Sequence, residues 1–158
     1  MSLIIALGSN IEPRWRHLQI ARDQLSRFFE FQIVSKIYES SPVDDFDQDT
    51  FLNQVIECLL PPQYTPPDVL KILQSIEISM GREKLRDKGP RNIDLDLIFY
   101  DLIKFQNHAL ITPHPQWLLR NFVLLPLKND LRFFAKISHL VPTDQFLKNS
   151  KTHWTKIH

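Results

Sequence analysis

The sequence contains very little cysteine and glycine. Of its 158 residues, one is a cysteine, Cys58, and three are glycines. A single cysteine forms no disulfide within the chain and no thiolate metal cluster, so we expect a reducing environment and any metal to have oxygen or nitrogen ligands. Three glycines are too few for a glycine-rich phosphate-binding loop, so a bound nucleotide would have to be held by cationic side chains and a metal.

Long hydrophobic runs and a strong net charge are also missing. No stretch approaches the roughly 18 to 20 continuous apolar residues of a membrane-spanning helix, and residues 1–5 contain no basic leader. With 19 basic and 18 acidic residues, the formal net charge is +1, which gives no overall attraction to nucleic acid or anionic lipid. We therefore expect a cytoplasmic protein with no nucleic-acid or membrane partner. A length of 158 residues, 43% of them hydrophobic, fits one compact domain with a sizeable core, so a single domain over residues 1–158 is expected.

Hydrophobic periodicity predicts an alternation of strands and helices. Residues 2–8 form a short apolar run typical of a buried strand, and residues 31–39 and 51–60 are rich in β-branched and aromatic residues. Apolar residues three and four apart predict one helix with Pro13 in its first turn and another that begins after Thr65. The predicted buried faces of these helices consist of Leu18, Ala21, Leu25, Phe28 and Phe29, and of Val69, Ile72, Leu73, Ile76 and Met80.

The second helix has clear signals at both ends. Thr65 and Asp68 form a capping-box pattern around Pro66, and Gly81 predicts the C-terminal stop. A strand over residues 92–100 follows. The order strand, helix, strand, strand, helix, strand is that of a ferredoxin-like α+β sandwich (βαββαβ), here with additional strands and helices in the C-terminal part. Connection rules place both helices on one face of the sheet.

The most informative segment covers residues 88–99. Residues two apart in a strand share a face, so Asp94 and Asp96 point the same way, with their Cα atoms about 6.5 Å apart. The hydrophobic residues that face the opposite side are Ile93, Leu95 and Leu97. Two neighbouring carboxylates repel each other unless a divalent cation lies between them, and such hard oxygen ligands select magnesium. An isolated Asp-x-Asp pair is more often the solvated face of an edge strand.

Five cationic residues stand directly before this acid pair. They are Arg82, Lys84, Arg86, Lys88 and Arg91. The guanidinium fork matches phosphate oxygens, so a polyphosphate bound beside the metal would explain the acids and the cations together. A solvated basic loop after a helix is the simpler alternative.

Other candidates are dispersed along the chain. His114 lies between two prolines, where it could hydrogen-bond a phosphate or face water. Phe51, Phe122 and Asn53 could form an aromatic clamp with one amide for a flat heterocycle, although single aromatic residues in strands usually belong to the core. The polar segment 40–50 is typical of a loop that closes over a ligand.

In combination, these motifs resemble the 6-hydroxymethyl-7,8-dihydropterin pyrophosphokinase family. The matching segments, in order, include Ala6–Asn10, Phe51–Asn53, Gly89–Leu97, Pro113–Pro115 and Arg120–Leu127. The resemblance implies a transferase of folate biosynthesis that passes diphosphate from ATP to 6-hydroxymethyl-7,8-dihydropterin and releases AMP. It implies two magnesium ions as cofactors and ATP and the pterin as partners. Apart from the resemblance, we expect a monomer.

The resemblance also implies roles for individual residues. Asp94 and Asp96 would bind the metals, and the catalytic residues would be Arg82, Arg91 and Asp96. The residues expected to bind ATP are Gln74, Glu77, Arg82, Lys84, Arg91, His114 and Arg120. Those expected to bind the pterin are Ser40, Val43, Phe51, Asn53, Asp94 and Phe122, with either Phe51 or Tyr38 stacking opposite Phe122.

The chain departs from the usual family pattern at several positions. Ser40 replaces a threonine, Asp44 a glycine and Lys88 a tryptophan, and Ala109 stands where some relatives have arginine. Two alternatives therefore stay open. One is another magnesium-dependent nucleotidyl or glycosyl transferase that uses the same acids, and the other is a pterin-binding module that has lost catalysis.

Overall fold

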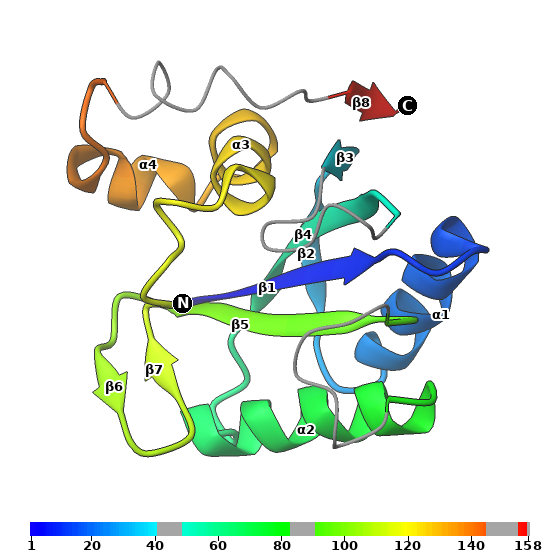
Figure 1. Cartoon of the computed structure of the whole chain (residues 1–158). Helices are drawn as coiled ribbons and strands as arrows, with labels where there is room; N and C mark the ends of the chain where they lie inside the picture. Colours follow the sequence, from blue (N-terminus) through cyan, green and yellow to red (C-terminus); the bar gives the residue numbers. More distant parts are fainter. Residues whose placement is uncertain (41–48, 83–90, 145–154, 158) are drawn as a thin grey trace.

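An antiparallel β-sheet with helices on both faces forms the fold (Figure 1). The computed structural model describes residues 1–40, 49–82, 91–144 and 155–157. The strands are β1 (Ser2–Ser9), β2 (Phe31–Val34), β3 (Ile37–Ser40), β4 (Phe51–Leu59), β5 (Asp94–Tyr100), β6 (Phe105–Gln106), β7 (Ile111–Thr112) and β8 (Thr155–Ile157). The helices are α1 (Arg14–Leu25), α2 (Pro66–Ser79), α3 (Asn121–Asp130), α4 (Phe134–Ile137) and the short 3-10 helix η1 (Ser138–Leu140).

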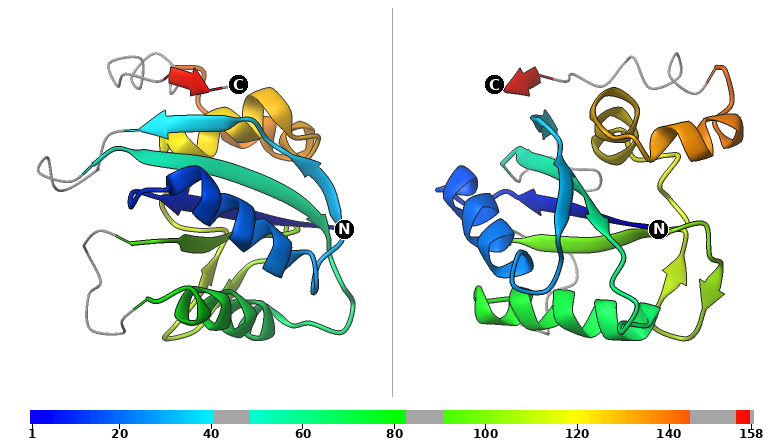
Figure 2. Two further views of the ribbon diagram at one scale, coloured as in Figure 1. Left: turned by 90° about the vertical axis from the view of Figure 1, so that its right-hand side faces the viewer. Right: turned by 180° about the vertical axis from the view of Figure 1, so that it is seen from behind.

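The main sheet has the strand order β5-β1-β4-β3-β8, and β2 also pairs with β4. Neighbouring strands in it are antiparallel. The strands β6 and β7 form a separate two-stranded sheet. As Figure 2 shows, α1 and α2 lie on one side of the main sheet, while α3 and α4 lie on the other. The mixed α/β architecture and the placement of α1 and α2 on one face agree with the sequence-based prediction.

Strand β1 explains why the sheet is covered on both faces. Its side chains alternate between two hydrophobic cores because successive residues of a strand point to opposite faces. Leu3, Ile5 and Leu7 belong to the core under α1 and α2, whereas Ile4 and Ala6 belong to the core under α3 and α4. A central strand buried on both faces needs the continuous apolar run seen in the sequence.

The prediction of one strand over residues 31–39 is wrong, because the structure has two strands there, β2 and β3. The break lies at the buried residue Ser35. Its hydroxyl accepts a hydrogen bond from the backbone N–H of Val55 at 2.9 Å and donates one to the carbonyl of Lys36 at 2.7 Å. A serine side chain thus takes the place of a backbone acceptor in the ladder, and the chain bends there.

The helix boundaries also refine the predictions. Helix α1 begins at Arg14, so Pro13 precedes the helix instead of occupying its first turn. Phe28 is 40% exposed, contrary to the predicted buried face, because the helix ends at Leu25 and its periodicity stops there. The capping box at Thr65 is present as predicted, and Gly81 ends α2 with a φ of 96°, a conformation that favours glycine.

Among the described residues, no helix combines the length and the apolar character needed to cross a membrane.

Candidate active site

One row of residues crosses four strands and connects the predicted metal site with the predicted pterin site. Gly8 in β1 lies opposite both Asp94 in β5 and Asn53 in β4, and Asn53 lies opposite Tyr38 in β3. Directly opposite residues on neighbouring strands share a face of the sheet. Asp96 lies two residues further along β5 on the same face. The acids and the amide, distant in sequence, therefore lie on one surface.

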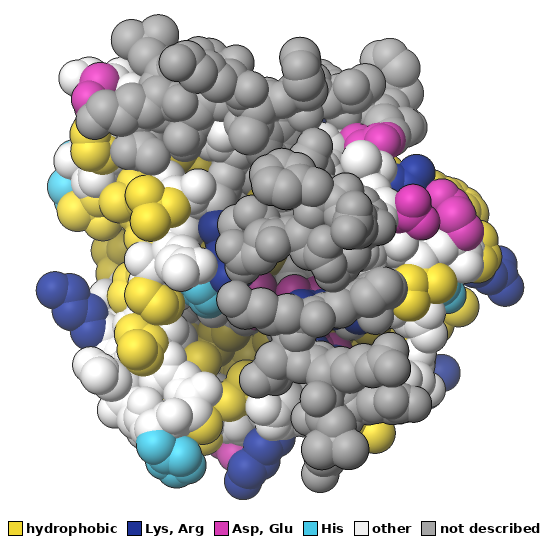
Figure 3. All heavy atoms as spheres, viewed as in Figure 1, with side chains coloured by type: hydrophobic (Ala, Val, Ile, Leu, Met, Phe, Trp, Pro, Cys, Tyr) yellow, Lys and Arg dark blue, Asp and Glu magenta, His cyan; other side chains and the backbone are white. Residues whose placement is uncertain are grey.

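The two acids face away from the core that α1 and α2 cover. Ile93, Leu95 and Leu97 belong to that core, as the strand alternation predicted. Asp94 and Asp96 are partly exposed, with side-chain exposures of 27% and 30%. In the space-filling view, acidic and basic side chains lie close together near the centre of the molecule (Figure 3).

Three arginines contact the acid pair in the structure. Oδ1 of Asp94 lies 3.1 Å from Nη1 of Arg82 and 3.0 Å from Nη1 of Arg91. Oδ2 of Asp96 accepts a hydrogen bond from Nη1 of Arg120 at 3.1 Å. The guanidinium carbon of Arg120 also lies 5.6 Å from the centre of the ring of Phe122, a cation–π geometry. These predicted site residues, drawn from three separate segments, do come together.

Glu77 connects α2 to the edge of the sheet. Its Oε1 accepts a hydrogen bond from the backbone N–H of Leu95 at 2.7 Å and lies 2.7 Å from Nη1 of Arg82. In the described strand order, β5 lies at one edge of the main sheet. The carboxylate of Glu77 therefore accepts a hydrogen bond from a backbone N–H that no neighbouring strand of this order pairs with. Burial raises the pKa of Glu77 to about 7, although Arg82 and the Leu95 N–H oppose this effect.

The pKa of Asp96 is also perturbed. Burial is the largest cause and repulsion from Asp94 adds to it, so the pKa rises to about 6 despite the opposing effects of Arg120 and Arg91. Two neighbouring carboxyl groups resist being ionised together, and a bound cation would allow both Asp94 and Asp96 to carry their charges.

The pterin-binding residues predicted on β3 and β4 form a preassembled polar corner. The side-chain nitrogen of Asn53 donates to Oγ of Ser40 at 2.7 Å and contacts the carbonyl oxygens of Tyr38 and Phe51 at 3.3 and 3.4 Å. Asn53 and Ser40 are both buried, while Phe51 is partly exposed. Tyr38 is buried and its hydroxyl donates to Asp130 at 3.0 Å, which leaves Phe51 as the more accessible of the two aromatic residues.

A cavity of about 310 Å³ lies beside the acid pair, lined in part by Asp96 and His114. Burial, with the nearby charge of Arg120 as a smaller cause, lowers the pKa of His114 to about 4, so its ring is neutral near pH 7. Ala109 also lines this cavity, where the family resemblance places an arginine in some relatives. Gln74 is exposed on α2, one turn before Glu77.

Two predicted site residues, Val43 and Lys84, lie outside the described residues, as do Asp44 and Lys88.

Sequence reasoning assigned no role to two further residues near the acid pair, Asn10 and Gly8. Asn10 is 2% exposed, and its Oδ1 accepts a hydrogen bond from the backbone N–H of Arg91 at 2.9 Å. Asn10 thus fixes the backbone beside the acid pair. Gly8 forms the floor between Asp94 and Asn53, because a Cβ there would lie 3.3 Å from Oδ1 of Asn53. The segment Gly8-Ser9-Asn10 was the available signal, but only the strand register reveals its partners.

The donor set fits magnesium. Asp94 and Asp96 offer hard oxygen ligands, and no cluster of three or more histidine, cysteine, aspartate or glutamate residues suited to a metal occurs in the described part of the chain. Magnesium is commonly bound by one or two carboxylates, with waters and substrate phosphates completing its octahedron. The pair therefore suits a metal that arrives with a phosphate ligand.

Comparison with known proteins gives a consistent result. Residues 4–131 match the family described as 7,8-dihydro-6-hydroxymethylpterin-pyrophosphokinase. A 2-amino-4-hydroxy-6-hydroxymethyldihydropteridine pyrophosphokinase of Bacillus subtilis is 36% identical over 143 residues, which cover 89% of this chain and 84% of that protein.

Two longer proteins are also similar. The folic acid synthesis protein fol1 of Pneumocystis carinii is 40% identical over 127 residues, 80% of this chain but 17% of that protein. The bifunctional protein FolKE of Lactococcus lactis is 35% identical over 143 residues, 87% of this chain and 40% of that protein. The chain thus spans less than half the length of these two relatives. Because the family match covers most of its residues, the chain belongs to the 7,8-dihydro-6-hydroxymethylpterin-pyrophosphokinase family.

Proposed function

We propose that this chain transfers diphosphate from ATP to 6-hydroxymethyl-7,8-dihydropterin, a step of folate biosynthesis. The observation that supports the proposal is the row formed by Asp94, Gly8 and Asn53, because an acid proposed to bind metal and an amide proposed to bind the heterocycle lie on one face of the sheet. In the reaction the hydroxymethyl oxygen of the pterin attacks the β-phosphorus of ATP. The bond from this phosphorus to the bridging oxygen of the α-phosphate breaks, and AMP leaves with that oxygen.

In this proposal Asp94 and Asp96 hold two magnesium ions. When bound, the metals supply charge neutralisation to the polyphosphate and polarise the oxygens that react. Asp96 is the acid nearer to the cavity, which it lines, so of the two acids it is the one that we propose assists removal of the proton from the substrate hydroxyl. Its role is supported by its place on the same strand face as Asp94.

The arginines serve the transferred phosphates. Arg82 and Arg91 both contact Oδ1 of Asp94. They are therefore close enough to bind the phosphate oxygens of a nucleotide whose metal ion is held by Asp94. Guanidinium groups bind phosphate in a bidentate manner and stabilise the charge that spreads over its oxygens during transfer. Positioning and charge neutralisation therefore account for most of the catalysis that we propose.

ATP would lie along the cavity and the arginines. His114 lines the cavity together with Asp96, and Arg120 contacts Asp96. A neutral His114 ring can donate one hydrogen bond to a phosphate oxygen. Glu77 orients Arg82, and Gln74 extends the same helix surface. Lys84, from the basic segment, completes the set proposed for ATP.

The pterin would lie against the polar corner of β3 and β4. Asn53 reads the edge of the heterocycle, and Ser40 fixes the amide through its hydroxyl. Phe51 and Phe122 supply the two ring faces, and both side chains are partly exposed. Stacking between aromatic faces suits a flat conjugated ring. Val43 and Asp94 complete the proposed set.

We extend the proposal to the fold, the assembly and the location. The order β5-β1-β4, with β2 and β3 beside β4 and both α1 and α2 on one face, supports a ferredoxin-like βαββαβ arrangement with a C-terminal addition. A monomer acting in the cytoplasm as a single domain over residues 1–158 is part of the same proposal. The single cysteine supports a reducing compartment.

One assay tests the proposed function. The protein is mixed with ATP, magnesium and 6-hydroxymethyl-7,8-dihydropterin, and the products are separated by chromatography. We expect AMP and the pterin diphosphate in equal amounts. Release of ADP or inorganic pyrophosphate instead would contradict diphosphate transfer and favour another transferase. Binding of the pterin without AMP, even at high protein concentration, would identify an inactive binding module.

A further inference from the structure

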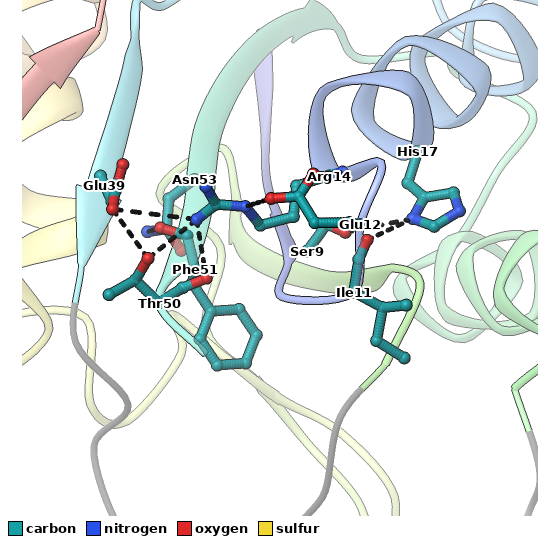
Figure 4. Close-up of polar contacts among 9 residues, drawn as sticks. All are labelled: Ser9, Ile11, Glu12, Arg14, His17, Glu39, Thr50, Phe51 and Asn53. Atoms are coloured by element: carbon teal, nitrogen blue, oxygen red, sulfur yellow. Dashed lines mark hydrogen bonds and ion pairs between the residues drawn. The ribbon is translucent and has the colours of Figure 1, made fainter. Parts of the chain in front are cut away.

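We propose that Arg14, which lies outside the sites described above, is a positioning residue for the pterin pocket. The proposal rests on the proposed function. Nη1 of Arg14, the first residue of α1, donates to the carbonyl oxygen of Thr50 at 2.9 Å and to its Oγ1 at 2.8 Å. The side chain is only 18% exposed. Figure 4 shows this guanidinium reaching from α1 to the start of β4.

Two acids complete the network around Arg14. On one side, Nε of Arg14 lies 2.7 Å from Oε1 of Glu12. On the other side, Oγ1 of Thr50 donates to Oε1 of Glu39 at 2.7 Å, and this oxygen lies 3.9 Å from Nη1 of Arg14. One guanidinium thus joins α1, the end of β3 and the start of β4. Charge-assisted hydrogen bonds of this kind are about twice as strong as neutral ones.

The network touches the residues directly beside the pterin pocket. Glu39 precedes Ser40 in β3, and Thr50 precedes Phe51 in β4. Ser40 and Phe51 are the last residues of the β3–β4 ladder and lie opposite each other. Thr50 lies just beyond that ladder, so its position depends on the contacts that Arg14 and Glu39 provide. Because neighbouring residues of a strand point to opposite faces, Glu39 and Thr50 contact Arg14 on the face of the sheet opposite to the one where Ser40 and Phe51 form the pocket.

A second arginine on the same helix provides a matched comparison. Arg22 donates to Oε1 of Gln54 in β4 at 2.6 Å, and Gln54 in turn donates to the carbonyl of Ser35 at 2.7 Å. Gln54 lies within β4 and is paired with Leu7 in the β1–β4 ladder, so the sheet itself fixes its backbone. Arg22 thus holds a residue within β4, whereas Arg14 holds Thr50, which precedes the first residue of β4. Loss of Arg14 should therefore displace Phe51, whereas loss of Arg22 should leave the pocket in place.

The test measures steady-state kinetics of Arg14→Met, Arg14→Lys and Arg22→Met with each substrate varied in turn. Methionine keeps an unbranched stem and removes the guanidinium. For Arg14→Met we expect the KM for the pterin to rise about tenfold, as the loss of one charge-assisted hydrogen bond implies, with kcat and the KM for ATP changed less than about twofold. Arg14→Lys should recover part of the loss, and Arg22→Met should change neither KM.

A second pair of variants keeps the test decisive where Arg14→Met does not fold. Thr50→Val removes the hydroxyl at nearly constant volume and should raise the KM for the pterin about threefold, while Thr50→Ser should not. Thermal unfolding of every variant verifies folding. An equal rise of both KM values, a fall in kcat alone, or the same pterin effect in Arg22→Met would overturn the positioning role.

The wild-type assay separates the two levels of the proposal. If the wild-type chain forms no AMP, the proposed function fails and the role of Arg14 in it falls too. If the wild-type chain is active and Arg14→Met keeps the wild-type KM for the pterin, only the positioning role fails.

Discussion

The two halves of the site are built from different interactions. At the β5 edge, charged groups are paired with each other: Glu77, Asp94 and Asp96 contact Arg82, Arg91 and Arg120. At the β3–β4 end, neutral groups are joined by hydrogen bonds, with Asn53 bound to Ser40 and to two backbone carbonyls. Gly8 separates the halves and belongs to the row that joins them.

This difference indicates which half must reorganise when ligands bind. In the charged half, a metal and a polyphosphate compete for the same atoms that the arginines and acids offer each other. There, each new contact with a ligand replaces an existing ion pair, so the loss of that pair offsets much of the binding free energy. The neutral half is already assembled, so a heterocycle gains from its preorganisation. Substitutions should therefore affect turnover in the first half and the KM for the pterin in the second.

The largest effect is expected from Asp96→Asn. The amide keeps the shape of the side chain but loses the negative charge that the proposed magnesium ions would require, so we expect kcat to fall about a thousandfold or more. The measurement is pterin-dependent AMP formation at saturating magnesium and ATP. The KM for the pterin should change little.

Asp68→Asn is the matched control for this substitution. Asp68 lies in the capping box of α2, and the same change there should lower stability without changing turnover. Near-normal turnover of Asp96→Asn at saturating magnesium would remove the metal role of this acid and with it the distinction between the two halves.

The next effect concerns Glu77 and the pH dependence of stability. Burial raises the pKa of Glu77 to about 7 from an ordinary value of 4.5. Between these two pH values the unfolded chain releases this proton before the folded chain does, so the contribution of Glu77 to stability is largest below pH 4.5 and declines as the pH rises toward 7. The decline amounts to about 3 kcal/mol at most.

Denaturant unfolding at pH 4.5, 6 and 7.5 measures this decline, with Glu77→Gln as the comparison. Glutamine retains an oxygen for the N–H of Leu95 but has no proton to release. The unfolding free energy of the variant should therefore lack the part of its decline with pH that Glu77 causes. Identical pH profiles for the two proteins would show that Arg82 keeps Glu77 ionised throughout this range.

A smaller effect is expected from Asn53→Ala in the neutral half. In Asn53→Ala the buried hydroxyl of Ser40 loses its amide partner, and the pterin loses the group proposed to read its edge. We expect the KM for the pterin to rise about thirtyfold, from the loss of one or two hydrogen bonds, while the KM for ATP stays within about twofold. The check is a pair of kinetic titrations in which each substrate is varied at saturation of the other. A comparable rise in the KM for ATP would mean that the halves are not independent.

Much of the fold and of the charged half was accessible from the sequence because their signals are local. The capping box at Thr65 and the strand alternation around Asp94 depend on residues close in the chain, and both appear as predicted. The break at Ser35 and the exposure of Phe28 did not follow from periodicity. Each is decided by a hydrogen bond or a helix end that single-residue propensities do not encode.

The contacts between distant segments could not be derived in this way. Asn10 meets the backbone of Arg91 across 81 positions, and Arg14 meets Thr50 across 36 positions. Both contacts depend on which strands become neighbours and in what register. A family resemblance names the residues that touch ligands, but the supporting residues behind them become visible only when the strands are paired.

The smallest effect is expected from Gly8→Ala, which tests the floor between the two halves. A Cβ at Gly8 would lie 3.3 Å from Oδ1 of Asn53, so the Asn53 side chain must shift by a few tenths of an ångström, while Cδ1 of Phe51, at 3.5 Å, would be in ordinary contact. Overpacking by one methyl group typically has an effect of about 1 kcal/mol, which corresponds to roughly a fivefold rise in the KM for the pterin. Ala6→Gly, two residues earlier on the same face of β1, is the control, since it alters the sheet without filling the floor. If Gly8→Ala lowers kcat far more than it raises this KM, the methyl group acts on the Asp94 side of the row, and the floor belongs to the charged half.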